Sequence, residues 1–210
     1  MDLYIVRHGQ SQDNAAAVQT GDSCLTDLGR RQAAATAEAF RQIAIDRLYV
    51  SPAQRAIETA SAISDTLDLL PVARADICER GWLYDQPGLS GRQMRQLCNR
   101  LQIGPEFPRD RGWAADRDSE TADELYCRAL HVVHSLRAEH PNGSGSVVLV
   151  SHAQFAGYLI SAALGFSREQ VETNWLRIYN CGISRLEFRD HATMMWYLNA
   201  HGHVADLVTV

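Results

Sequence analysis

The segment Leu3-Tyr4-Ile5-Val6-Arg7-His8-Gly9-Gln10-Ser11 runs from four apolar residues directly into a cation, an imidazole and a glycine. The apolar run predicts a buried strand, so the reactive groups stand at its carboxyl end. In open α/β sheets that is the position where ligands bind. Histidine can accept a phosphoryl group, the planar arginine fork matches phosphate oxygens, and glycine lets the backbone approach a ligand closely. The tripeptide alone is weak evidence for a phosphate site, and its interpretation depends on the rest of the chain.

After this strand, apolar runs alternate with segments of helical periodicity. Four more apolar runs predict strands, at 47–50, 147–150, 183–188 and 194–198. The periodic segments predict four helices, at 26–43, 52–67, 119–139 and 153–164. Thr26 is a candidate N-cap, and Pro52 is well placed to open its helix. The length of 210 residues favours one domain over residues 1–210. The predicted fold is therefore α/β, a three-layer sandwich with a central, mostly parallel sheet flanked by helices.

The composition limits the classes of protein to consider. A formal charge of -5 argues against a nucleic-acid partner. All 20 basic residues are arginine, so a strong anion site must use arginine, histidine, backbone N–H groups or a metal. The five cysteines are scattered and form no Cys-x-x-Cys pair, which indicates reduced thiols. No apolar run approaches membrane-spanning length, and no signal sequence precedes the first strand. We therefore expect a cytoplasmic protein without a membrane partner.

The stretch 81–117 differs from the rest, because it is rich in proline, glycine and arginine and has little sustained periodicity. It is either a surface excursion or a lid over the site, and the pattern favours neither. Four of its arginines could grip a second anionic group of a substrate or could simply be solvated: Arg92, Arg95, Arg109 and Arg111.

Reactive residues follow the predicted strands at three places. Arg7-His8-Gly9 follows the first strand, Ser51-Pro52 with Arg55 follows the second, and Ser151-His152-Ala153 follows the strand at 147–150. The carboxyl ends of parallel strands lie on one edge of a sheet, so we expect these residues to converge. Two arginines, two histidines and a helix N-terminus around one point predict a site for a doubly charged phosphoryl group.

Further residues complete a pattern along the chain. In order, its members are Arg7-His8-Gly9, Asn14, Leu25-Thr26-Asp27-Leu28-Gly29-Arg30-Arg31-Gln32-Ala33, Ser51-Pro52 with Arg55 and Thr59-Ala60, Glu79, Ser151-His152 and Asn180-Cys181-Gly182-Ile183. This order and spacing resemble the histidine phosphatase superfamily, which includes the cofactor-dependent phosphoglycerate mutases and the fructose-2,6-bisphosphatases. The resemblance covers residues 3 to about 164 and continues at 180–183. Each motif is modest, but their order and spacing together are specific.

The resemblance implies a two-step phosphoryl transfer through a phosphohistidine, with no metal and no other cofactor. His8 would be the catalytic nucleophile that attacks phosphorus in line. Arg7, Arg55 and His152 would hold the equatorial oxygens, where charge is concentrated during the transfer.

The resemblance also implies further donors and an acid. Asn14 and the backbone amide of Ala153 are expected to bind phosphate, although Asn14 could instead cap the helix that follows it. Glu79 matches the catalytic residue that protonates the leaving alcohol and then takes a proton from water. Asp76 and Asp85 are nearby carboxylates that could be aligned in place of Glu79.

The chain departs from the family at two places. Ala153 stands where members often carry glycine. Because alanine keeps the backbone N–H, phosphate binding should survive this change. The acidic, tryptophan-containing segment that commonly follows the catalytic acid is only loosely echoed by Gly81-Trp82-Leu83-Tyr84-Asp85 and Gly88. The extended basic segment of the mutases is not found. Because a mutase must retain a phosphorylated product and a phosphatase need only admit water, this difference favours a phosphatase.

These observations predict a phosphoric monoester hydrolase that acts on a small phosphorylated metabolite and releases inorganic phosphate. Two alternatives stay open. One is a phosphomutase or sugar-bisphosphatase with the same nucleophile, and the other is a weakly active protein that binds phospho-ligands. The apolar stretch 204–210 could pack against its own chain or join copies in a homo-oligomer.

Other signals are weaker. His131 and His134 lie one helical turn apart, but no carboxylate at suitable spacing supports a metal site, so none is predicted. His201-Gly202-His203 is expected to be a loop that could at most line the site. Four aromatic residues could stack on a substrate but are more often packing residues: Trp82, Tyr84, Trp113 and Trp175.

Overall fold

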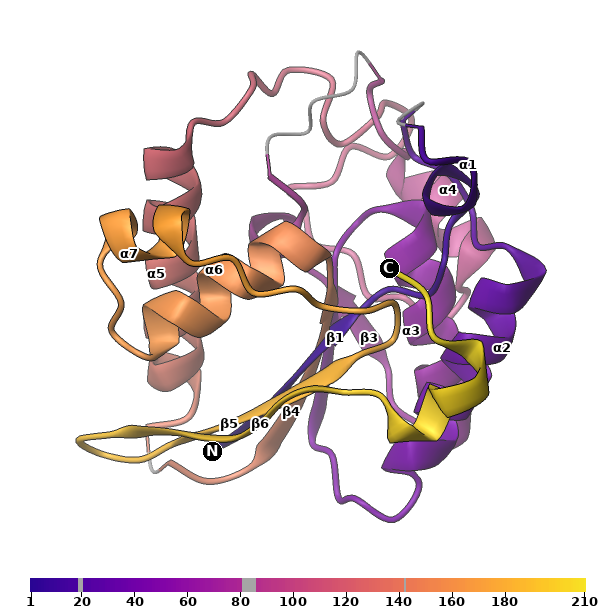
Figure 1. The fold of residues 1–210 in the computed structure, drawn as a ribbon. Coiled ribbons are helices and arrows are strands. Elements are labelled where there is room, and N and C mark those ends of the chain that lie inside the picture. Colours follow the sequence, from indigo (N-terminus) through magenta and orange to yellow (C-terminus); the bar gives the residue numbers. More distant parts are fainter. Residues whose placement is uncertain (19–20, 81–85, 142) are drawn as a thin grey trace.

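The computed structural model describes residues 1–18, 21–80, 86–141 and 143–210. A six-stranded sheet with the order β3-β2-β4-β1-β5-β6 forms its centre (Figure 1). The strands are β1 (Asp2–Arg7), β2 (Arg47–Val50), β3 (Pro71–Ala73), β4 (Ser146–Ser151), β5 (Ile183–Phe188) and β6 (Thr193–Ala200). Strands β1 to β4 pair in parallel with one another, and β5 and β6 are added antiparallel at the edge next to β1. The predicted mostly parallel sheet is confirmed.

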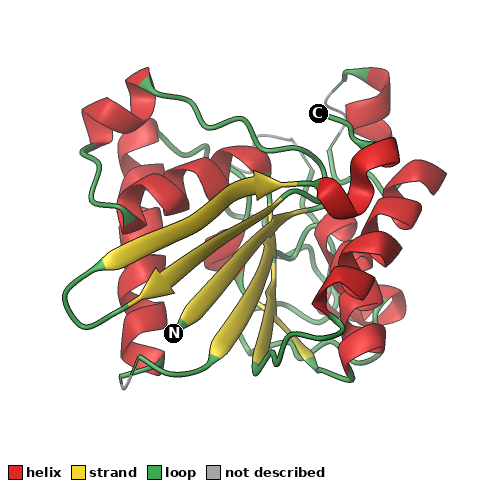
Figure 2. Cartoon of the chain, turned by 60° about the horizontal axis from the view of Figure 1, so that its bottom comes forward, coloured by secondary structure: helices red, strands yellow, loops and turns green. Residues whose placement is uncertain are grey.

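Helices cover both faces of the sheet (Figures 1 and 2). One face carries α5 (Ala122–Glu139), α6 (Ala153–Ala163) and α7 (Arg168–Thr173). The other carries α2 (Asp27–Phe40), α3 (Gln54–Leu67) and α4 (Gly91–Leu97). The remaining helical segments are α1 (Gln12–Ala16) and two 3₁₀ turns, η1 (Ala75–Ile77) and η2 (Gly202–Leu207). The predicted three-layer α/β sandwich is therefore confirmed.

The central strands bury both of their faces, which explains their continuous apolar sequences. In β1, Leu3 and Ile5 point into the core under α5 and α6, whereas Tyr4 and Val6 point into the core under α2 and α3. Alternate residues of β4 divide between the two cores in the same way. Burial on both sides fixes the register of these strands, because a shift by one residue would exchange every side chain between the faces.

Three predicted helix boundaries were wrong. The helix after Thr26 ends at Phe40 and not at residue 43, although Thr26 caps it as predicted by accepting a hydrogen bond from Gly29 N. Pro52 does not open α3, which begins at Gln54 with Ala53 as its N-cap. The long helix begins at Ala122 and not near residue 119, because Thr121 and Glu124 form a reciprocal capping box there.

The stretch 86–117 contains structure that its sequence does not reveal. Its helix α4 packs beside α3. Six side chains of this stretch are buried in the core on that face of the sheet: Met94, Cys98, Leu101, Phe107, Trp113 and Ala114. The stretch from residue 94 to residue 114 is thus anchored to the body of the fold. The predicted insertion or lid falls partly on residues 81–85, which lie outside the described residues and include Trp82, Tyr84 and Asp85.

No helix in the described part of the chain is long and apolar enough to cross a membrane.

Candidate active site

The register of the parallel strands brings the three predicted strand ends together. Arg7 at the end of β1 lies opposite Ser151 at the end of β4. Val50 at the end of β2 lies opposite Val150 on the other side of β4. The residues that follow these strands surround a cavity of about 420 Å³. Its lining residues are Arg7, His8, Ser11, Asp13, Asn14, Ala17, Val18, Arg55, Glu79, Arg80, Ala153, Gln154 and Val210.

His8 turns an unprotonated ring nitrogen toward a buried cation, Arg55. The His8 side chain is 3% exposed, and its Nδ1 lies 2.7 Å from the carbonyl oxygen of Gly9. Since a carbonyl only accepts, Nδ1 carries the hydrogen and Nε2 keeps its lone pair. Arg55 Nε donates to this Nε2 at 3.1 Å. Burial, followed by the charges of Arg55 and Arg7, lowers the pKa of His8 well below 6.5. His8 is therefore a neutral imidazole near pH 7, with its nucleophilic nitrogen turned to a guanidinium.

Two buried guanidinium groups give the cavity its positive charge. Arg7 is anchored by a bond from one terminal nitrogen to the carbonyl oxygen of Ile178 at 2.7 Å. Its Nε is buried and has no hydrogen-bond partner among the described residues. Burial, reinforced by Arg55, lowers the pKa of Arg7 to about 10, so it stays charged at neutral pH. Two such cations beside one cavity make a strong site for a dianion.

His152 lies next to His8 but is not among the residues that line the cavity. Its ring centroid is 5.1 Å from that of His8, and the side chain is fully buried. Its Nε2 lies 2.7 Å from Ser51 Oγ, and its Nδ1 has no partner in the described part of the chain. Burial, followed by the charge of Arg55, lowers the pKa of His152 well below 6.5. A neutral His152 thus lies beside the nucleophile and against Ser51, the residue that follows β2.

Gly9 allows a close contact with a helix, and not the close approach to a ligand that was expected. It does not line the cavity. A Cβ at this position would stand 2.6 Å from the carbonyl oxygen of Gly29, in the first turn of α2. Glycine is needed here so that the loop after β1 can pack against that helix. Gly9 N also donates to Thr59 Oγ1 at 3.0 Å, which ties the loop to α3.

Asn14 both caps a helix and lines the cavity. Its Oδ1 accepts from Ser11 N at 3.2 Å, which completes the capping box of α1. The same oxygen accepts from Asn180 Nδ2 at 3.2 Å. Both bonds fall on the carbonyl oxygen, so the amide Nδ2 is left to donate to a group in the cavity.

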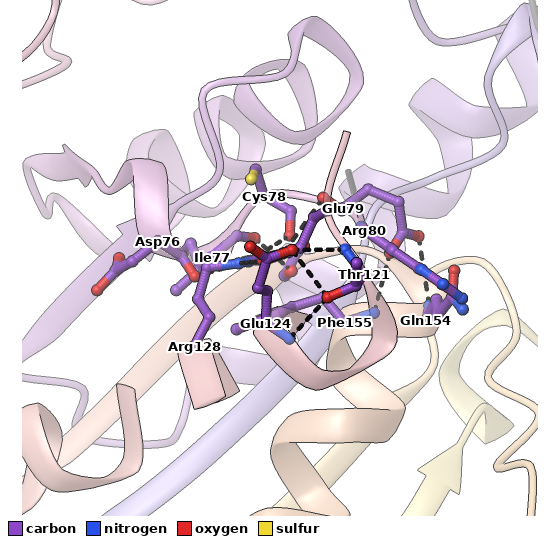
Figure 3. A network of polar contacts seen from close by, with 12 residues as sticks. Asp76, Ile77, Cys78, Glu79, Arg80, Thr121, Glu124, Arg128, Gln154 and Phe155 are labelled. Carbon is purple, nitrogen blue, oxygen red and sulfur yellow. Dashed lines mark hydrogen bonds and ion pairs between the residues drawn. The ribbon is translucent and has the colours of Figure 1, made fainter. Parts of the chain in front are cut away.

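Glu79 lies against the N-terminus of α6 (Figure 3). Its Oε1 accepts from Phe155 N at 2.9 Å, and its Oε2 accepts from Gln154 N at 3.3 Å. Arg128 holds the segment before Glu79 by donating to the carbonyl oxygen of Cys78 at 2.9 Å. These bonds place the carboxylate at the cavity wall beside the backbone amide of Ala153.

The two alternative carboxylates do not occupy this place. Asp76 forms an ion pair with Arg74 at 2.8 Å, and neither residue lines the cavity. Asp85 lies outside the described residues. Of the three candidates, Glu79 is the one that the described structure places at the cavity.

Several other predicted candidates lie away from the cavity. Arg92 pairs with Asp110 and Arg111 with Asp116 on the surface, and Arg95 and Arg109 are exposed. His203 does not line the site but contacts Thr36 Oγ1 and the carbonyl oxygen of Cys181. Trp113 is buried in the core under α3, and Trp175 is 69% exposed.

The residues described contain no group of three or more histidine, cysteine, aspartate or glutamate side chains that could hold a metal ion. His131 and His134 are both exposed on α5.

Sequence reasoning missed several residues of the site, among them Asp13, Ala17 and Val18 at the cavity. Arg80, Gln154 and Val210 also line the cavity. Asp22 lies behind Arg55, with Oδ1 3.6 Å from a terminal guanidinium nitrogen and 2.7 Å from its donor Gln54 N. Its second oxygen is buried with no partner in the part of the chain that the structure describes. Asp22 stands three residues before the recognisable segment 25–33, but a single aspartate in a loop carries no pattern of its own.

Asp22 makes the stability of the protein depend on pH. Burial, reinforced by Glu58 and Asp13, raises its pKa from 3.8 to about 6, against the opposing effects of Arg55 and the Gln54 N–H. The folded state therefore binds more protons than the unfolded state between about pH 4 and pH 6, so stability falls as pH rises through this window. A shift of about two units corresponds to roughly 3 kcal/mol.

Asp22→Asn cannot titrate, so it is expected to lack this contribution. The free energy of unfolding of the wild type minus that of Asp22→Asn should fall by about 3 kcal/mol between pH 4 and pH 7. Urea unfolding of both proteins across this range measures the difference. Parallel stability curves would show that Asp22 ionises as readily in the folded protein as in the unfolded chain.

Comparison with known proteins assigns the class to which this fold and this cavity belong. The model of the histidine phosphatase superfamily (branch 1) matches residues 3–201. The chain belongs to this superfamily.

The chain is similar in sequence to a protein named as a probable mutase and in fold to solved structures of phosphatases. The probable phosphoglycerate mutase GpmB of Yersinia pestis is 30% identical over 218 residues, which cover 99% of this chain and 95% of that protein. A mycobacterial glucosyl-3-phosphoglycerate phosphatase superposes with a TM-score of 0.71 at 23% identity, over 95% of this chain and 99% of that one. Phosphoserine phosphatase from Entamoeba histolytica in complex with 3-phosphoglyceric acid gives a TM-score of 0.70 at 21% identity, over 97% of this chain and 98% of that one. At these identities the two structures share the fold.

Proposed function

We propose that the chain is a metal-independent phosphomonoesterase that hydrolyses a small phosphorylated metabolite through a phosphohistidine. One observation carries the proposal. The Nε2 lone pair of neutral His8 faces the Arg55 guanidinium at 3.1 Å, beside a cavity that Arg7 and Glu79 also line. A nucleophile, two cations and a carboxyl group that exchanges a proton are the groups that this reaction requires.

In the first step the phosphoryl group enters between the two guanidinium groups. Its oxygens take over the Arg55 N–H that His8 accepts in the free protein, which releases the Nε2 lone pair for attack. Glu79 enters this step as the carboxylic acid. The N–P bond forms as the bond from phosphorus to the alcohol oxygen breaks, and Glu79 gives its proton to the departing oxygen. The guanidinium groups stabilise the charge on the equatorial oxygens during the transfer.

In the second step water enters the place of the alcohol. Glu79, now a carboxylate, takes a proton from the water as its oxygen attacks phosphorus. The N–P bond breaks and its electron pair returns to His8 Nε2. Inorganic phosphate leaves, and the imidazole is again neutral with its hydrogen on Nδ1.

Two features support hydrolysis over transfer to a second alcohol. Arg92 and Arg111 pair with carboxylates on the surface, and no arginine of the described stretch 86–117 lines the cavity. The cations at the described cavity are then Arg7, Arg55 and Arg80, which is a small set for retaining a phosphorylated product. The solved structures compared above carry phosphatase names. The name of the 30% identical relative favours a phosphoglycerate mutase as the second candidate.

Phosphate release from a panel of phosphoesters in the presence of EDTA tests the proposal. The panel contains p-nitrophenyl phosphate, phosphoserine, 2- and 3-phosphoglycerate and sugar mono- and bisphosphates. We expect metal-independent release of inorganic phosphate from at least one member. Interconversion of 2- and 3-phosphoglycerate without release would instead establish the mutase. Micromolar binding of phosphate without any turnover would establish a phospho-ligand-binding protein.

A further inference from the structure

The C-terminal segment of the chain reaches the cavity from η2, which packs against α2. It leaves η2 and runs toward the loop that follows β1 (Figure 1). Val210 lines the cavity together with Ala17 and Val18 of the α1 region. Thr209, one residue earlier, makes the hydrogen bonds that connect this segment to the site.

Asn180 connects Thr209 to two residues of the proposed catalytic machinery. It is fully buried, and its Nδ2 donates to the carbonyl oxygen of His8 at 3.0 Å and to Asn14 Oδ1 at 3.2 Å. Its Oδ1 accepts from Thr209 Oγ1 at 3.0 Å, and its backbone N–H donates to the Thr209 carbonyl at 2.9 Å. A reversed Asn180 amide would place its oxygen against the carbonyl of His8.

Gln32 fixes the direction of the Thr209 hydroxyl. The backbone N–H of Gln10 can only donate, and it bonds Gln32 Oε1 at 2.7 Å. Gln32 Nε2 must therefore be the donor at its other end, to the Leu207 carbonyl at 2.6 Å and to Thr209 Oγ1 at 2.8 Å. Because the hydroxyl oxygen accepts from Gln32, its single hydrogen is free to donate to Asn180 Oδ1.

Every bond in this series thus donates in one direction, from the backbone of Gln10 to Asn14. At the end of the series Asn14 Oδ1 accepts from Asn180 as well as from the backbone N–H of Ser11, and its Nδ2 is the group left for the cavity. We propose that Thr209 and Asn180 are positioning residues that orient the Asn14 amide toward the phosphoryl group of the substrate. The inference rests on the phosphatase function proposed above and adds two residues that do not touch the substrate themselves.

Thr209→Val tests the series, since valine keeps the shape of threonine and removes the hydroxyl. With Asn180 Oδ1 no longer held, we expect KM and the inhibition constant of inorganic phosphate to rise about tenfold, with kcat changed by less than about threefold. Thr209→Ser restores the hydroxyl and is expected to restore the phosphate affinity. Thr193→Val is the matched control, because Thr193 lies on β6, does not line the cavity, and accepts a side-chain hydrogen bond from Arg137 of α5.

A double-mutant cycle separates this role from a structural one. In the Asn14→Ala background, Thr209→Val should leave KM and phosphate inhibition unchanged, because the residue through which it acts is gone. Effects that add in the double variant, or a Thr209→Val protein with the phosphate affinity of the wild type, would overturn the inference.

The proposed function fails independently, if the wild type releases no phosphate from any substrate. Calorimetric binding of inorganic phosphate to the same variants then tests the series without turnover. A weaker phosphate affinity in Thr209→Val that Thr209→Ser restores supports the inference, and equal affinities in all three proteins contradict it.

Discussion

His8→Ala is expected to abolish phosphate release, with a fall in kcat/KM of at least about 10⁴-fold. The covalent intermediate cannot form without the Nε2 lone pair, and water would have to attack the phosphoester directly. Phosphate should still bind in the cavity, since Arg7 and Arg55 remain. The measurement compares phosphate release by wild type and variant, together with phosphate binding by calorimetry.

His131→Ala is the matched control, because it removes an exposed imidazole on α5. It should retain the activity of the wild type. A second measurement follows the intermediate directly. Wild type incubated briefly with ³²P-labelled substrate and quenched in base should carry an acid-labile label, and His8→Ala should carry none. A label that survives in the variant, or turnover within about tenfold of the wild type, would assign the nucleophile to another residue.

The convergence of the site could be predicted from sequence because it depends on local patterns. Buried parallel strands read as uninterrupted apolar runs, and their carboxyl ends are marked by the first polar residues after them. The structure aligns Arg7 with Ser151 and Val50 with Val150, so residues 144 and 100 positions apart meet at one edge. The family resemblance then assigned expected roles to side chains that periodicity alone could not distinguish.

The residues that hold the site residues in position could not be predicted in this way. Asp22 contacts Arg55 from a loop, and Thr209 contacts Asn180 from the end of the chain. Such contacts depend on the tertiary fold and leave no periodic trace in the sequence. The same holds for β3 and α4, which are too short for periodicity to reveal and are stabilised by packing against longer elements. His152 shows a related limit, since its position in the chain predicts proximity to His8 but not that its side chain is fully buried and does not line the cavity.

Arg55→Ala is expected to lower kcat/KM by about 10²- to 10³-fold, which corresponds to roughly 3–4 kcal/mol of lost transition-state stabilisation. Arg55 is the cation that contacts the nucleophilic nitrogen, and its loss removes a donor from the place where the phosphoryl oxygens would lie. Arg7 is held by the carbonyl of Ile178 and cannot fill that place. Arg41→Ala is the matched control, because it removes an arginine from an exposed ion pair with Glu38 on α2 and should leave kcat/KM unchanged.

The buried Asp22 carboxylate loses its cation in Arg55→Ala, so this variant should also be less stable at neutral pH. Asp22→Asn in the same chain removes that uncompensated charge and is expected to recover stability without recovering activity. Thermal unfolding and steady-state kinetics of the single and double variants measure the two effects separately. If the folded double variant turned over substrate at nearly the wild-type rate, Arg55 would hold the loop at Asp22 in place, and the phosphoryl group would bind elsewhere in the cavity.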